Sequence, residues 1–231
     1  MSKRNILLLV FLMIISSISI IILFLKNQHH ATADVGFFID TTQTVSKYDT
    51  IIDKHIYKSY FNTTYKEPLF VSYVLYKGGG ECSREKFRFK NDCLISTATA
   101  KDYSKSGYDE GHLANAEDFA YNCEYDELTF RFYNCVPQTP ELNRGIWHRW
   151  ENIIRKESQK DSLLIITGNV FDNETIGNNV YVPSYCWKVV ESLSNKNIIH
   201  IIYCSNNDVP ICDTIKLSTL YKRIGYELPL R

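Results

Sequence analysis

The chain has 231 residues, with 26 basic and 26 acidic side chains and therefore a formal net charge of +0. This balance argues against a protein that coats a polyanion through many phosphate contacts, although a local basic patch remains compatible with a polyanionic ligand. The length and a hydrophobic content of 45% predict one domain with a substantial buried core.

The N-terminal residues 1–26 predict a targeting element. Lys3 and Arg4 precede the charge-free run 6–25, which is about as long as a helix that crosses a membrane. Residues 31–33 form an A-x-A pattern that is typical of signal-peptide cleavage, so a cleaved signal peptide and an uncleaved signal anchor both stay open. In either case the rest of the chain is expected to be secreted, or membrane-anchored with its domain outside the cytoplasm.

The polar stretch 27–50 has few aliphatic clusters and predicts a tether, which leaves 51–231 as the folded domain. All seven cysteines lie in that domain, which fits an oxidising compartment. Pairing each cysteine with its nearest neighbour predicts three disulfides and leaves Cys186 as a buried free thiol, while other connectivities stay open. The predicted pairs are Cys82 with Cys93, Cys123 with Cys135, and Cys204 with Cys212.

Runs of β-branched and aromatic residues predict most of the domain to be strands. Residues 69–76 (LFVSYVLY) indicate a central strand that ends at three glycines, whereas 53–58 is too weak to separate strand from turn. A short helix is predicted within 213–225. Further strands are predicted at 128–133, 162–171, 186–192 and 197–204.

The strongest helix prediction begins at Thr139. Thr139 fits the N-cap, Pro140 the first helical position, and Glu141 places an acid in the first turn. Apolar residues at helical spacing continue to about Gln159. One strong helix among many strands predicts the α+β class.

The segment 107–119 (GYDEGHLANAEDF) contains the main candidate for catalysis, His112. Gly111 allows a close backbone approach, Asp109 is placed to orient an imidazole, and an ordinary histidine pKa lies near neutrality. A lone histidine is more often structural than catalytic, so the neighbouring motifs must decide.

The predicted helix supplies a second set of polar side chains. Asn143, Glu151 and Arg155 stand at i, i+8 and i+12, which spreads them over roughly 120° of one side of an α-helix. An amide oxygen suits Mg²⁺, a carboxylate can hold a metal-bound water, and a guanidinium can bind a phosphate. On the helix alone, an ordinary surface ion pair between Glu151 and Arg155 is the favoured interpretation. Residues 131–160 carry six basic against three acidic side chains, which favours a polyanionic ligand.

Three motifs in order resemble the sugar-non-specific DNA/RNA endonucleases, the ββα-metal (His-Me finger, endonuclease G-like) family. They are DEGH at 109–112, NCVPQ at 134–138, and LNRGIW at 142–147 followed by Glu151. The corresponding family signatures are D-R-G-H, N-x-x-P-Q and L-N-x-G-x-W. The resemblance extends from about residue 69 to 197, and it implies an α+β ββα-metal finger with a mainly antiparallel central sheet flanked by helices.

The resemblance also implies roles for these side chains. His112 would be the general base, and Asn143 the direct protein ligand of a single Mg²⁺, with Mn²⁺ as the alternative ion. Glu151 and Arg155 would support catalysis. The implied activity is metal-dependent hydrolysis of DNA or RNA phosphodiester bonds that leaves 5′ phosphates.

An arginine ahead of the histidine motif would contact the scissile phosphate. We place it at Arg84, with Arg88 as the second choice, and we expect Asn134 to contact the substrate as well. Asp109 and Glu110 are expected to support the site. Glu110 stands where the family has arginine, so an anion replaces a cation beside the phosphate path.

This departure keeps a non-enzymatic alternative open: a membrane-tethered nuclease-like domain that binds nucleic acid or a protein partner without cleaving it. A phosphatase would require carboxylates clustered around two metals, which the sequence does not show. The expected partner is DNA, RNA or both, together with the membrane if the N-terminal segment is uncleaved. A homodimer stays open.

Overall fold

The computed structural model describes residues 48–231. The predicted signal segment and nearly all of the predicted tether lie outside the described residues. Among residues 48–231, no helix is long and apolar enough to cross a membrane. The domain begins slightly before the expected residue 51, because Tyr48 packs edge-on against Tyr60 and the Asp49 N–H donates to the Phe61 carbonyl.

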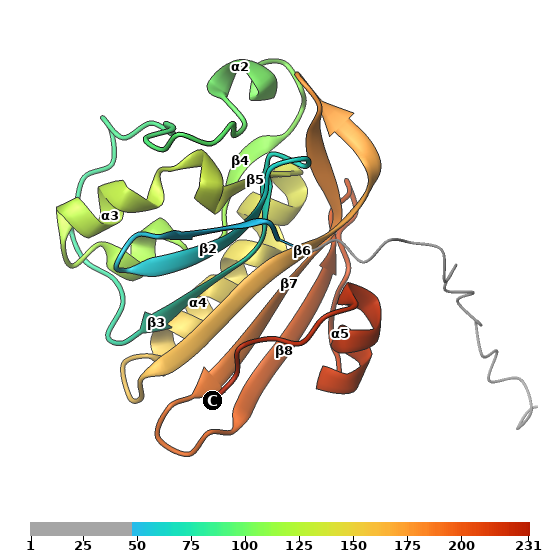
Figure 1. Cartoon of the computed structure of the whole chain (residues 1–231). Coiled ribbons are helices and arrows are strands. Elements are labelled where there is room, and N and C mark those ends of the chain that lie inside the picture. The colour runs from blue at the N-terminus through green and yellow to red at the C-terminus, as the bar shows by residue number, and fades with distance from the viewer. Residues whose placement is uncertain (1–47) are drawn as a thin grey trace, which may run out of the picture. The chain divides into compact units, whose positions relative to one another are not determined.

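A seven-stranded sheet forms the centre of the domain, and each of its neighbouring strand pairs is antiparallel (Figure 1). The order across the sheet is β1-β2-β3-β6-β7-β8-β9. The strands are β1 Thr50–Asp53, β2 Tyr57–Asn62, β3 Glu67–Leu75, β6 Leu163–Ile176, β7 Val180–Ser192, β8 Ile198–Ser205 and β9 Cys212–Thr214.

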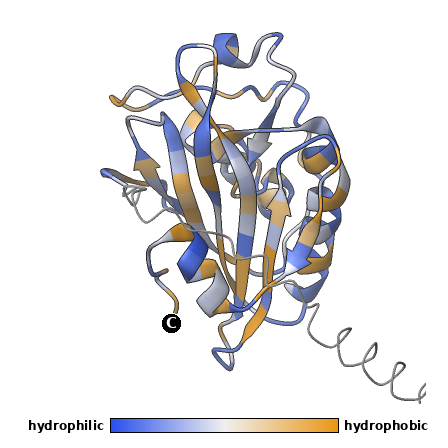
Figure 2. Ribbon diagram, turned by 90° about the vertical axis from the view of Figure 1, so that its right-hand side faces the viewer, coloured by the Kyte–Doolittle hydropathy of each residue, from blue (hydrophilic) through white to orange (hydrophobic). Residues whose placement is uncertain are grey.

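Both faces of the sheet are covered, which explains why the central strands are almost continuously apolar. Successive side chains on a strand point to opposite faces, so neighbouring residues enter different cores. In Figure 2, helices lie on both sides of the sheet, and hydrophobic segments run along the strands between them. Val71, Ile165 and Val190 belong to the core that includes residues of α4, whereas Phe70, Ile166 and Val189 belong to the core that includes residues of α5.

The predicted strands at 69–76, 162–171, 186–192 and 197–204 are confirmed as β3, β6, β7 and β8. The predicted strand at 128–133 is wrong. Its first residues end helix α3 (Cys123–Thr129), and the next ones form the 3-10 turn η2 (Phe132–Asn134). Asn122 caps α3 by accepting hydrogen bonds from the Glu124 and Tyr125 N–H groups, and this local start signal prevails over the apolar alternation that follows.

The predicted helix begins where expected but is not regular. The Leu142 N–H donates to Thr139 Oγ1 at 3.3 Å, which confirms Thr139 as the cap. A π-helical turn, η3 (Leu142–Trp147), then precedes the α-helix α4 (His148–Glu157). Gly145, inside η3, has a non-helical φ of −100° and ψ of −111°. The turn of about 100° per residue expected for a regular α-helix therefore does not continue from Asn143 to Glu151 and Arg155.

The predicted C-terminal helix is confirmed as α5 (Leu217–Ile224), which ends at Gly225 with a left-handed φ of 75°. The remaining elements were not predicted. A two-stranded sheet joins β4 (Asp109–His112) to β5 (Cys135–Gln138), with His112 opposite Cys135. Two short helices, α2 (Ala100–Tyr103) and η1 (Ala116–Phe119), lie on either side of β4 in sequence.

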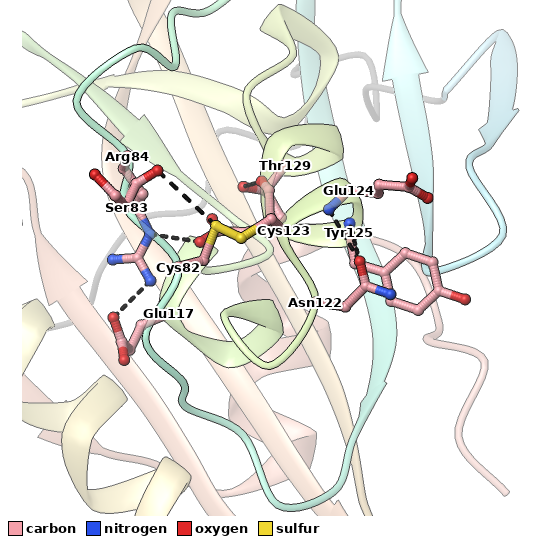
Figure 3. The surroundings of a disulfide bond; sticks show 10 residues. Cys82, Ser83, Arg84, Glu117, Asn122, Cys123, Glu124, Tyr125 and Thr129 are labelled. Carbon is pink, nitrogen blue, oxygen red and sulfur yellow. Dashed lines mark hydrogen bonds and ion pairs between the residues drawn. A yellow bond between two sulfur atoms is a disulfide. The ribbon is translucent and has the colours of Figure 1, made fainter.

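The disulfide prediction is partly wrong. Cys204–Cys212 is confirmed, and so is Cys186 as a buried free thiol. The other disulfide joins Cys82 to Cys123, at the start of α3 (Figure 3). Cys135 is free because β5 places it in the interior, where its Sγ lies 3.2 Å from the Tyr103 hydroxyl, and Cys93 is free as well.

Candidate active site

The β4–β5 pair holds the first two motifs side by side and places His112 at the end of β4. Gly111 makes this possible, because a Cβ on it would lie 2.3 Å from Gln138 Oε1. Asn134 fastens the turn after β4: it donates to the Ala114 and Thr129 carbonyls and accepts from the Ala114 N–H. Asn134 is fully buried, so it holds the histidine segment instead of contacting substrate as predicted.

Two phenylalanine rings enclose the His112 imidazole. The ring centroids of Phe89 and Phe130 lie 4.5 Å and 4.6 Å from that of His112. His112 Nε2 is buried and has no hydrogen-bond partner, so Nδ1 is the ring nitrogen left to meet solvent. Burial, assisted by the positive charge of Arg84, lowers the pKa of His112 to about 3. The imidazole is therefore neutral, as a base must be.

A cavity of about 370 Å³ opens beside His112. It brings together three residues that the sequence placed in one site: the candidate base His112 and the two arginines Arg84 and Arg155. Helix α4 also contributes His148 and Asn152, which the sequence did not single out. The full lining is Arg84, His112, Asn115, Ala116, Glu117, Phe130, His148, Asn152 and Arg155.

Arg84 is held in place by two carboxylates. Its Nε donates to Asp126 Oδ2 at 2.7 Å, and its Nη2 donates to Glu117 Oε2 at 2.6 Å (Figure 3). The exposed Arg88 is not part of the cavity lining, and its Nη1 donates to the backbone carbonyls of Glu85 and Phe87. Of the two arginines considered from the sequence, Arg84 is thus the one that lines the cavity.

Arg155 is also held in place by several side chains. Its Nε donates to the buried Asp118 at 2.9 Å, while its Nη2 donates to Asn115 Oδ1 at 2.9 Å. Asp118 also accepts a hydrogen bond from the Tyr73 hydroxyl at 2.8 Å. Burial raises the pKa of the Asp118 carboxyl, and the nearby charges of Arg155 and Lys188 oppose that rise.

Glu151 lies beneath the cavity wall and is 6% exposed. Burial raises the pKa of Glu151, and the Lys188 ammonium, whose Nζ is 3.8 Å from Glu151 Oε1, opposes the rise. Lys188 is 2% exposed and its Nζ lies 4.8 Å from the centroid of the Trp147 ring. Lys188 was not predicted as part of the site, although a lysine inside the apolar run 186–190 is the signal that identifies it.

Asp109 does not orient the imidazole as expected. Its Oδ2 accepts from Asn143 Nδ2 at 3.0 Å and from Arg144 Nε at 2.8 Å. These bonds fix the amide of Asn143, and no donor in residues 48–231 uses its carbonyl oxygen. Asn143 does not line the cavity beside His112, because the π-helical turn before Gly145 changes its direction relative to Arg155.

The carbonyl oxygen of Asn143 fits a hard divalent cation that retains most of its waters. Among the described residues, no group of three or more His, Cys, Asp or Glu side chains is arranged to enclose a metal ion. A site built from one amide oxygen and waters, with Glu151 further along the same helical segment, is thus the arrangement that these residues offer.

Glu110 projects from the same side of β4 as His112, two residues away. It is partly buried and pairs across the ladder with Pro137. Burial raises the pKa of the Glu110 carboxyl, whereas the positive charge of Arg88 opposes the rise. The carboxylate that departs from the family signature is therefore close to His112 in the strand and does not line the cavity.

A strand pair that presents a histidine, followed by a helix that presents an asparagine and an arginine, has the ββα arrangement implied by the motifs. Residues 36–225 match the family described as DNA/RNA non-specific endonuclease. The chain belongs to this family.

The chain is similar to a nuclease of Nostoc sp., with 38% identity over 95 residues, which cover 40% of this chain and 35% of the relative. It is 32% identical over 128 residues to the mitochondrial nuclease EXOG of Xenopus laevis, which covers 48% of this chain and 36% of that relative. It is 30% identical over 128 residues to human mitochondrial endonuclease G, which covers 48% of this chain and 43% of that relative. The matched segments thus span less than half the length of each relative.

The fold is also similar to that of a chain in the crystal structure of the EndoG/EndoGI complex. The TM-score is 0.64 with 24% identity, over 76% of this chain and 83% of that one. This likeness confirms the predicted α+β fold, with a large antiparallel sheet and few helices.

Proposed function

We propose that the chain is a metal-dependent, sugar-non-specific endonuclease, which hydrolyses the phosphodiester bonds of both DNA and RNA. The observation that carries this proposal is the shared cavity of a neutral histidine, His112, and two immobilised arginines, Arg84 and Arg155. A base next to fixed cations suits attack of water on an anionic phosphate. The family membership and the similar nucleases support the same reaction.

In the proposed reaction, His112 accepts a proton from water at Nδ1, and the resulting hydroxide attacks phosphorus. Arg84 and Arg155 bind the phosphate oxygens and offset the negative charge that develops on them. The bond from phosphorus to O3′ breaks, and O3′ leaves with the bonding electron pair and takes a proton from solvent water. His112 then returns its proton to solvent, and the products carry a 5′ phosphate and a 3′ hydroxyl. The anionic phosphate beside Arg84 also counters the charge that helps to lower the pKa of His112 in the free protein.

The proposed cofactor is Mg²⁺, with Mn²⁺ as an alternative, held through the carbonyl oxygen of Asn143. When bound, such an ion supplies Lewis-acid stabilisation of the phosphate and of the departing oxygen. Asp109 fixes the amide that presents this oxygen, and Glu151 is proposed to orient waters of the ion.

Plasmid nicking tests the proposal directly. Wild-type protein should convert supercoiled plasmid to nicked and linear forms with Mg²⁺ and lose this activity with EDTA. His112→Ala should be at least about 100-fold slower, because general-base catalysis contributes on that order. The matched control is His55→Asn, an exposed turn residue with φ 68° that asparagine tolerates, and it should cut like wild type.

An unchanged nicking rate for folded His112→Ala would contradict the role of this residue. The product ends provide a second readout, since 5′ phosphates block labelling by a polynucleotide kinase until a phosphatase removes them.

Glu110 supports a second candidate function, a domain that binds nucleic acid or a protein partner without cutting. Its carboxylate stands on the side of β4 that presents His112 and disfavours a phosphate there. EDTA-sensitive loss of supercoiled plasmid in the wild-type protein would exclude this candidate, whereas plasmid binding without nicking would establish it.

We also propose that the domain works outside the cytoplasm, either secreted or tethered by the N-terminal segment. The support is its two disulfides, Cys82–Cys123 and Cys204–Cys212, which an oxidising compartment maintains. Alkylation of the native-source protein in denaturant should modify three cysteines before reduction and seven after it. Modification of all seven before reduction would contradict the proposal.

A further inference from the structure

The segment from Arg84 to Lys90 reads REKFRFK, so that basic and aromatic side chains alternate along it. It is an irregular stretch beside the cavity. Arg84 lines the cavity at one end, and Phe89 contacts the His112 ring near the other. We call residues 84–90 the KFRFK segment, after its last five letters.

Both ends of the KFRFK segment are anchored. The Cys82–Cys123 disulfide and the two ion pairs of Arg84 fix the first end to η1 and α3 (Figure 3). At the other end, the Lys90 N–H donates to the Phe130 carbonyl at 3.3 Å and the Phe132 N–H donates to the Lys90 carbonyl at 3.2 Å. A segment held at both ends loses little conformational entropy when a ligand binds to it.

The aromatic rings of the segment continue the surface that begins at the base. Phe130 lines the cavity and contacts His112, and the centroids of Phe87 and Phe89 each lie 5.3 Å from that of Phe130. Phe87 and Phe130 are partly exposed. A row of rings thus leads from His112 out of the cavity to Phe87.

The cations of the segment fall into two groups. Arg84 and Lys90 are already paired, with Glu117 and Asp126 in the first case and with Glu127 in the second. Lys86 and Arg88 are exposed, and within residues 48–231 neither forms an ion pair with a carboxylate. These two residues flank Phe87 in sequence. Arg88 uses Nη1 for the Glu85 and Phe87 carbonyls and its charge acts on Glu110, so its Nε and Nη2 and the Lys86 ammonium are the groups left to meet phosphates.

We propose that the KFRFK segment binds a single-stranded stretch of the substrate next to the scissile phosphate. Unpaired bases stack on Phe87 and Phe130, and Lys86 and Arg88 neutralise the adjacent phosphates. Rings and cations alternate in this way in sequence-tolerant single-strand binding. In a duplex the base faces are covered by their neighbours, so stacking on Phe87 would require unstacking at a cost of a few kcal/mol. The inference rests on the proposed function for the cutting site and adds the preferred form of its substrate.

Fluorescence anisotropy separates binding from cleavage. The full chain carrying His112→Ala, kept in EDTA, is titrated into a labelled 12-nucleotide single strand and into the same strand in a duplex. The single strand should bind more tightly. Phe87→Leu, which keeps an apolar side chain without an aromatic face, should weaken single-strand binding by at least about fivefold and leave duplex binding unchanged.

Phe87→Trp should retain single-strand binding, and Tyr76→Ala, which removes an exposed ring outside the cavity lining, should have no effect on either substrate. Single-strand binding weakens as salt concentration rises, and the slope of log K against log[salt] reports the number of phosphates neutralised. Exchange of Lys86 and Arg88 for Gln should make this slope shallower by roughly 0.7 for each charge removed. Equal affinity of the protein for the single strand and the duplex would overturn the proposal. So would a Phe87→Leu variant whose affinity falls by the same factor for the single strand and the duplex.

The two proposals can fail separately. Absence of nicking by the wild-type protein, with single-strand preference intact, would overturn the nuclease function and keep the binding surface. Nicking without any single-strand preference would do the reverse.

Discussion

The two walls of the cavity hold their charged and titratable groups by opposite means. On the β4 wall, the Phe89 and Phe130 rings surround His112, and its buried Nε2 has no partner. On the α4 wall, Arg155 and Glu151 each meet a buried group of opposite charge. Apolar enclosure keeps the His112 imidazole neutral, whereas compensated charge keeps Arg155 and Glu151 in fixed positions. A reaction that needs an uncharged base beside charged phosphate ligands requires both environments in one cavity.

The largest expected effect comes from removing the compensation on the α4 wall. Lys188→Met leaves the buried carboxylates of Glu151 and Asp118 without this ammonium, and breaking a buried pair costs about 3–5 kcal/mol. Urea unfolding should show this loss in the free energy of unfolding. The control Lys90→Met removes an exposed pair with Glu127 and should cost at most about 1 kcal/mol.

A double variant makes the comparison stricter. Adding Glu151→Gln to Lys188→Met removes one uncompensated charge, so part of the lost stability should return. Equal stability of Lys188→Met and Lys90→Met would show that the α4 wall does not depend on paired charge, and the contrast between the walls would then fail.

The contrast also shows what the sequence can and cannot reveal about the site. The first motif identified His112, the family resemblance added Arg84, and the spacing along the predicted helix added Arg155. The structure places these three residues around one cavity. Motif order succeeds because each motif carries its own local constraint, such as the close approach at Gly111. The partners of Arg155 and Glu151 come from other elements, Asp118 from η1 and Lys188 from β7. No local pattern in the sequence therefore linked Lys188 to Glu151.

Errors in the fold have similar physical causes. The segment 128–133, predicted as a strand, is the end of a helix followed by a 3-10 turn. The helix is started by the Asn122 cap, which lies before the segment whose apolar alternation gave the strand prediction. The helix that begins after Thr139 was predicted, but its π-helical turn was not, since Gly145 alone does not specify which way a helix bends. The pairing of Cys82 with Cys123 spans 41 residues, and nearest-neighbour reasoning cannot find it.

The smallest expected effect concerns the β4 wall and appears only as a dependence on pH. The pKa of His112 is about 3 in the folded protein and near 6.5 when unfolded, so between these values the unfolded chain binds a proton that the native protein does not. The stability contributed by neutral His112 is thus complete above pH 6.5 and is lost as the pH falls toward 3. Between pH 7 and 5.5, wild type should lose roughly 1 kcal/mol more than His112→Gln, which has no proton to bind.

Urea unfolding of wild type and His112→Gln across this pH range measures the difference, in which the other titrating groups common to both proteins largely cancel. The charge of Arg84 also lowers the pKa of His112, after burial. Arg84→Gln should therefore raise this pKa slightly, and the variant should lose slightly less stability than wild type as the pH falls. Parallel pH profiles for wild type and His112→Gln would mean that the imidazole is solvated like a surface histidine. The aromatic enclosure would then have no bearing on its protonation, and the difference between the two walls would reduce to the paired charges of α4.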